Sequence, residues 1–145
     1  MQAIPCGAVT EALSMSTTFF CPFCGKQSPD DDPVCHSCGK SIGHWREHSF
    51  EERLLLTLHH PILEHRMMAI QLLGQRKYER AVPVFAEMIT AGQDVYTLRE
   101  IVCALAQMNT NESRQLIVQL REHPSPVVRT TCDTAAGTSP KGARR

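Results

Sequence analysis

The sequence lacks the features that would direct it to a membrane or to a polyanion. No apolar run approaches the roughly 20 residues that a helix needs to span a bilayer, and the N-terminus has neither the basic start nor the apolar core of a signal peptide. The 15 Lys and Arg residues balance the 15 Asp and Glu residues, so no overall field attracts nucleic acid or an anionic surface. We therefore expect a cytoplasmic protein with no membrane association.

Aromatic residues are scarce, which limits the hydrophobic core. Only 6% of the 145 residues are aromatic, although 42% are hydrophobic. A chain of this length and composition can form one modest core together with a small module that a metal ion holds together. The composition therefore predicts two structural units.

Four of the seven cysteines form two matched pairs. Two residues separate Cys21 from Cys24 and Cys35 from Cys38, and each pair is followed by Gly and Lys. Four thiolates at this spacing are the ligands of a closed, tetrahedral structural zinc site. Glycine permits the tight turn that directs backbone N–H groups at sulfur, and the lysines can offset the negative charge of four thiolates on one Zn²⁺ ion.

Other uses of paired cysteines agree less well with the sequence. Disulfides are typical of exported proteins, but no export signal accompanies these cysteines. A redox Cys-x-x-Cys pair opens a helix in a βαβ unit, and no such unit surrounds either pair. Iron in a rubredoxin-like site uses similar pairs, but the loop between these pairs is short and lacks the aromatic core residues of that fold.

Residues 20–42 resemble the zinc-ribbon family. They contain Cys-Pro-x-Cys-Gly-Lys, an acidic turn and a second Cys-x-x-Cys-Gly-Lys. The resemblance implies a small zinc-bound β ribbon in which one Zn²⁺ per chain has a structural role.

Beyond the cysteine pairs, the sequence repeats every 30 to 33 residues. Nine-residue segments beginning at Arg66, Arg99 and Arg129 align with one another, and a second register of apolar residues, 31 apart, includes Leu54 and Phe85. The pattern predicts six helices, over residues 49–59, 62–74, 79–91, 94–108, 112–122 and 126–136, with the last one frayed. Each is too short to be stable alone, so the helices must pack on their neighbours.

This pattern resembles short HEAT-like repeats of the kind also found in phycobilisome lyases. The resemblance is carried by the arginine at the start of each first helix and by Ala-Val-Pro-Val-Phe at residues 81–85. It implies an all-α solenoid, that is, an α–α superhelix. The expected organisation is a disordered leader (1–18, with Met15 as an alternative start), a zinc ribbon (19–43), a linker (44–48), HEAT-like repeats (49–136) and a disordered basic tail (137–145).

No catalytic constellation is visible in the sequence. It has no His-Glu pair repeated on successive first helices, no Ser-His-Asp order and no phosphate-binding glycine loop. The ribbon carries an acidic loop at Asp30–Asp32, which opposes phosphate contacts. We therefore expect a non-catalytic protein–protein interaction scaffold or adaptor. The alternatives are a nucleic-acid-associated zinc-ribbon adaptor and, from the resemblance, a chromophore-lyase-like protein.

Five residues are candidates for contact with a partner protein or a second copy of the chain. Arg66, Arg99 and Arg129 recur at one repeat position, where they either bind carbonyls and acidic groups between repeats or line a surface for an acidic partner. Trp45, the one tryptophan, either packs between the two modules or forms an exposed anchor. Val128 lies in the last helix, where an incomplete repeat is expected to leave an apolar strip.

Overall fold

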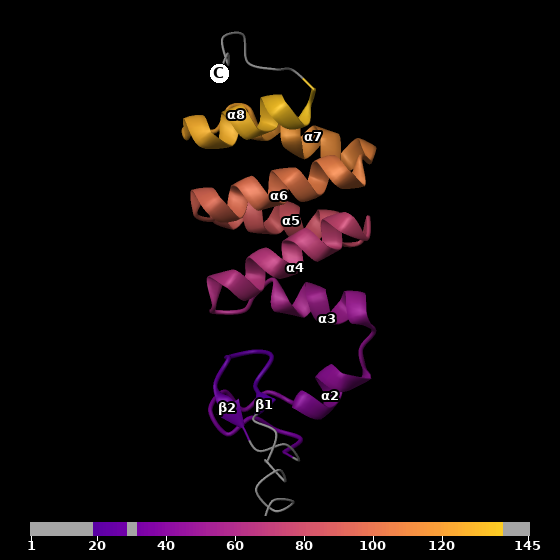
Figure 1. Ribbon diagram of the computed structural model, residues 1–145, viewed down its shortest axis with the longest axis vertical. Helices are drawn as coiled ribbons and strands as arrows, with labels where there is room; N and C mark the ends of the chain where they lie inside the picture. Colours follow the sequence, from indigo (N-terminus) through magenta and orange to yellow (C-terminus); the bar gives the residue numbers. More distant parts are fainter. Residues whose placement is uncertain (1–18, 29–31, 138–145) are drawn as a thin grey trace, which may run out of the picture.

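The computed structural model describes residues 19–28 and 32–137. The expected leader and nearly all of the expected basic tail lie outside the described residues. Within the described ranges the chain forms seven helices and one small two-stranded sheet. Figure 1 shows the sheet near one end of the molecule and helix α8 near the other. No helix in the described part of the chain is long and apolar enough to cross a bilayer.

Each cysteine pair lies between two short extended segments. Strands β1 (Phe19–Phe20) and β2 (Gln27–Ser28) pair antiparallel on either side of the first cysteine pair. An isolated antiparallel bridge between Val34 and Ser41 encloses the second pair in the same way. The two Cys-x-x-Cys-Gly-Lys segments therefore form two similar turns, called here the first knuckle (residues 21–26) and the second knuckle (residues 35–40).

A short helix follows the second knuckle directly. Helix α2 (Ile42–Glu47) begins at Ser41, whose hydroxyl accepts a hydrogen bond from the backbone N–H of His44 at 3.1 Å. Ile42 is completely buried in a small hydrophobic cluster with Cys21 and Cys35. Residues 44–47, expected in a linker, are therefore helical, because burial of Ile42 against the knuckles fixes the start of the helix.

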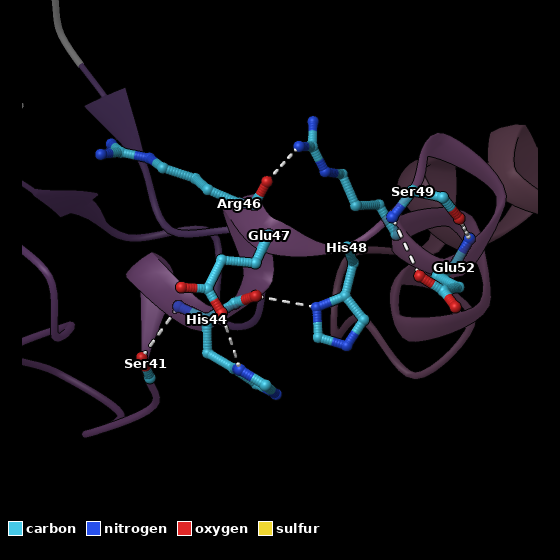
Figure 2. A network of polar contacts seen from close by, with 8 residues as sticks. Ser41, His44, Arg46, Glu47, His48, Ser49 and Glu52 are labelled. Carbon is cyan, nitrogen blue, oxygen red and sulfur yellow. Dashed lines mark hydrogen bonds and ion pairs between the residues drawn. The ribbon is translucent and has the colours of Figure 1, made fainter.

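The connection between α2 and the helices that follow it is held by hydrogen bonds (Figure 2). His48, the last residue of the expected linker, donates from Nδ1 to the carbonyl of His44 at 2.8 Å. Helix α3 (Phe50–Thr57) then begins with a capping box, in which Ser49 and Glu52 each accept a backbone hydrogen bond from the other, at 3.2 and 2.9 Å. These contacts fix where α2 ends and where α3 begins.

The remaining helices agree closely with the sequence prediction. They are α4 (Leu63–Gln75), α5 (Ala81–Ala91), α6 (Val95–Met108), α7 (Asn111–Leu120) and α8 (Pro126–Ala135). Every bound of α3–α8 lies within two residues of the expected one. Helix α8 is a regular helix of 10 residues rather than a frayed one, because Val128 and Cys132 pack in the main core.

Helices α3–α8, called here the helical stack, follow one another along the long axis of the molecule (Figure 1). Helix α6 packs against both α4 and α8, and α7 packs against α5, α6 and α8. The axes of α4 and α6 approach closely at Gly74, where an added Cβ would lie 2.7 Å from Cα of Ala104. One buried hydrophobic cluster runs through the whole stack and is separate from the cluster under the knuckles.

Candidate metal centre and the surfaces around it

The four sulfur atoms of the cysteine pairs lie close together. The Sγ atoms of Cys21 and Cys38 are 3.7 Å apart, as are those of Cys24 and Cys35, and all four lie within 4.8 Å of one another. A tetrahedral Zn²⁺ with Zn–S bonds of about 2.3 Å separates its sulfur ligands by about 3.8 Å, so the arrangement fits this ion. Among the described residues, no other group of three or more His, Cys, Asp or Glu side chains meets in this way.

The two knuckles have the same backbone geometry. In the first, Cys21 N–H donates to the carbonyl of Lys26 at 2.8 Å and Gly25 N–H donates to the carbonyl of Cys21 at 2.9 Å. The corresponding bonds of the second knuckle are 3.0 and 2.8 Å. Gly25 and Gly39 have φ values of +76° and +74°, which glycine adopts without the steric cost that other residues carry. The repeated glycine is therefore required by the turn in both places.

Backbone N–H groups and burial shift the pKa values of the cysteine thiols in opposite directions. Hydrogen bonds from the backbone of Cys38 and Ser37 lower the pKa of Cys35 to about 6. For Cys21, burial raises the pKa to about 12, in spite of its own backbone hydrogen bonds, one of which comes from Phe23 N–H at 3.4 Å. Four thiolates this close require a cation to balance their charge, which is the condition that a divalent metal ion satisfies.

The glycine of the first knuckle packs against the helical stack, whereas the glycine of the second does not. A Cβ added to Gly25 would lie 2.8 Å from Cδ1 of Ile62 and 3.2 Å from Cε1 of His60, both in the turn between α3 and α4. A Cβ added to Gly39 would meet no atom within 4 Å. The first cysteine of each knuckle is buried, with Cys21 1% and Cys35 2% exposed, whereas the second is half-buried in the first knuckle (Cys24) and exposed in the second (Cys38). The two knuckles are therefore equivalent in sequence but not in surroundings.

His60 is the buried polar residue of this contact, with 2% of its surface exposed. Its Nδ1 accepts a hydrogen bond from the backbone N–H of Ile62 at 3.1 Å, and its Nε2 lies 3.4 Å from Nδ1 of His65. Burial, followed by the neighbouring His65, lowers the pKa of His60, although a hydrogen bond with the backbone of Cys21 acts in the opposite direction. The neutral imidazole therefore packs beneath the first knuckle.

Two of the three repeated arginines bind the turn before their own helix. Nη1 of Arg66 donates to the carbonyls of His60 and Pro61 at 2.8 and 3.1 Å. Nη1 of Arg129 donates to the corresponding carbonyls of His123 and Pro124, at 2.7 and 2.8 Å. The structure thus gives both side chains a role within the fold, which is the first of the two alternatives raised by the sequence.

Arg99 differs from the other two arginines. Gln93 and Asp94 stand six and five residues before it, in place of His and Pro, its side chain is exposed, and among the described residues no hydrogen bond or ion pair involves it. It lines a groove between α6 and α8 with a volume of about 660 Å³. Arg99 is therefore the one member of the arginine set that the fold leaves available to a ligand.

The other two candidates for partner contact, Trp45 and Val128, pack against other residues of the fold. Trp45 is half-buried, and the guanidinium of Arg53 lies 4.8 Å from the centre of its ring while donating to the carbonyl of Arg46 at 2.5 Å. Val128 is 0% exposed. The expectation that Val128 contacts a partner is wrong, because α8 turns this side chain into the main core. Its neighbour Val127, 48% exposed, presents the apolar surface instead.

Comparisons with protein-family models, with curated proteins and with solved structures find no match to this chain. What the coordinates define is a class of architecture: a four-cysteine site that could hold a metal ion, built on two knuckles and packed at one end of a stack of helices.

Two features of the site were not predicted from the sequence: the contact between the first knuckle and the α3–α4 turn, and the difference between Arg99 and the other two arginines. The contact of Gly25 with His60 joins residues 35 positions apart, and nothing in the local pattern distinguishes Gly25 from Gly39. The role of Arg66 and Arg129 had a visible signal, since both follow a His-Pro pair six residues upstream and Arg99 does not. Comparing the residues before each repeated arginine would have identified Arg99.

Proposed function

We propose that the protein is a non-catalytic adaptor that binds a protein partner through its helical stack. In this proposal the stack is a short HEAT-like solenoid and the knuckles form a zinc ribbon. The observation that carries the proposal is the difference within the arginine set: two members bind their own turns, whereas Arg99 lies beside a groove with no hydrogen-bond or ion-pair partner in the part of the chain that the structure describes. An unpaired cation beside an apolar surface is typical of a binding site rather than of a structural contact.

The metal in this proposal is one structural Zn²⁺ per chain, held by Cys21, Cys24, Cys35 and Cys38. Four sulfur donors at tetrahedral separations favour Zn²⁺ over the harder divalent ions, and four protein ligands leave no position for a substrate. When bound, the ion supplies the charge that lets the thiolates pack together. Zinc would therefore stabilise the ribbon and take no part in a reaction.

Affinity purification of the full-length, zinc-loaded protein from native lysate, with and without RNase, tests the adaptor function. We expect defined proteins to co-purify at a constant ratio in both samples. Loss of the co-purifying proteins after RNase treatment would instead support nucleic-acid association. A chain that captures no protein under either condition would contradict the adaptor function. Metal analysis of the same preparation should give one zinc per chain, and a value near zero would contradict the zinc site.

A further inference from the structure

The groove between α6 and α8 offers very few polar groups to a ligand. Its walls include Cys103, Ala106 and Val127. Two threonine hydroxyls in the groove are engaged within α8, since Thr131 donates to the carbonyl of Val127 at 2.8 Å and Thr134 donates to that of Thr130 at 2.9 Å. The surface between the helices is therefore mainly apolar.

The same walls limit the conformation of an occupant. Beyond the first turn of α8, which has no side-chain cap, the backbone groups of the two helices are hydrogen-bonded within their own helices, so the groove provides no strand edge with which an extended peptide could pair. A helix satisfies its own backbone hydrogen bonds and needs only an apolar face to enter such a groove. The groove is therefore suited to an amphipathic helix.

Arg99 determines the charge that the occupant should carry. Within residues 19–28 and 32–137 it is the one charged residue that lines the groove, and its guanidinium has no acidic partner there. A carboxylate on the incoming helix would pair with it. The chain's own residues 138–145 do not meet this requirement, because they contain Lys141, Arg144 and Arg145 but no Asp or Glu.

We propose that the α6–α8 groove binds an amphipathic helix of a partner protein, with its apolar face against Val127 and an Asp or Glu paired with Arg99. This inference rests on the proposed adaptor function and adds the kind of partner segment recognised. Tyr96, 65% exposed one turn before Arg99, extends the surface beyond the groove and would increase the area in contact.

A displayed library of random peptides tests the proposal. The peptides would have about 15 residues, enough for four helical turns, and would be selected on the full-length, zinc-loaded protein. We expect the selected peptides to carry apolar residues at helical spacing and one Asp or Glu. Binding should fall about tenfold or more on Arg99→Glu, because the charge pair becomes a repulsion. Binding should also be lost on Thr130→Trp, which would fill the groove, and on placing Pro in the middle of the peptide.

Arg114→Glu on α7 is the matched control. It makes the same change of charge at another exposed arginine that does not line the groove, and it should leave affinity unchanged within about twofold. Selected peptides that lack a carboxylate, or that bind the Arg99→Glu variant as tightly as the wild type, would overturn the proposal. Binding that depends on Arg114 instead would overturn the assignment of the binding site to the groove while preserving the adaptor function. Failure to recover any specific peptide would count against both the groove and the adaptor function.

Sedimentation of the protein alone tests whether a second copy of the chain, instead of a partner protein, occupies the groove. We expect wild type and the Arg99→Glu variant to sediment identically. Self-association of the wild type that disappears in Arg99→Glu would show that a second copy fills the groove, which would overturn the assignment to a partner protein.

Discussion

Replacing either knuckle glycine by alanine separates the cost of the turn from the cost of the contact with the helical stack. Gly25 and Gly39 have nearly the same φ, +76° and +74°, so alanine carries the same backbone penalty at both. Only at Gly25 does the new methyl meet other atoms, at 2.8 Å from Ile62 and 3.2 Å from His60. Gly39→Ala is therefore a matched control for Gly25→Ala.

The magnitudes follow from these contacts. A non-glycine residue in this backbone region costs about 1 kcal/mol. Overpacking adds about 1–3 kcal/mol, and we expect the lower part of this range because Ile62 is partly exposed and its Cδ1 can move. His60 is buried and hydrogen-bonded, so it cannot yield as easily. We therefore expect a cost of about 1 kcal/mol for Gly39→Ala and about 2–3 kcal/mol for Gly25→Ala.

In the proposed zinc site, zinc affinity would measure this cost directly, because we expect a metal-held unit this small to fold only when metal binds, so that lost folding energy becomes lost affinity. Competition with a chelating dye should show a loss of about fivefold for Gly39→Ala and about 30-fold or more for Gly25→Ala. Adding Ile62→Ala should restore part of the loss in Gly25→Ala and none in Gly39→Ala, as coupled residues do in a double-mutant cycle. Equal losses for the two glycine variants would refute the docking of the first knuckle.

Four further outcomes follow from the structure. Zinc affinity should rise with pH between about 6 and 8, because Cys21 must release its proton on binding and burial raises its pKa to about 12. An affinity that does not change with pH in dye competition would contradict this. Chelation should abolish the structure of the knuckles but retain most of the helical circular dichroism signal, since the two hydrophobic clusters are separate. Simultaneous loss of the knuckle structure and the helical signal would contradict the division into two structural units. In denaturant titrations, Val128→Asp should cost about 3 kcal/mol or more as a buried charge, whereas Val127→Asp should change the free energy of unfolding by about 0.5 kcal/mol or less. Arg129→Ala should cost about 1 kcal/mol through its two carbonyl hydrogen bonds, and Arg99→Ala close to nothing; equal effects would refute the different roles assigned to them.

Local signals made most of the fold predictable. The spacing of Cys21, Cys24, Cys35 and Cys38 indicated a four-cysteine site because each pair closes its own turn within six residues. The bounds of α3–α8 followed from apolar periodicity and from the turn residues between the helices, and in the structure the Ser49–Glu52 capping box fixes the start of α3. These features depend on residues close together in the chain, where sequence patterns carry the most information.

Long-range packing decided what could not be predicted. Residues 44–47 are helical because Ile42 packs beneath the knuckles, and Val128 is buried because α8 packs on α6 and α7. Gly25 and Gly39 are the same residue in the same local motif, yet only one of them meets the helical stack. A contact between distant segments leaves no periodic signal in either of them.

The order of packing in the helical stack also determines where local unfolding begins. The extensive contacts among the described helices join helices no more than two positions apart in the chain, so none of these contacts ties α3 to α8. Helix α3 contacts α2 through Arg53, whose guanidinium lies over the ring of Trp45, whereas among the described elements α8 packs chiefly on α6 and α7. Transient local unfolding should therefore begin at α8, and amide hydrogen exchange should slow progressively from α8 toward the middle of the stack.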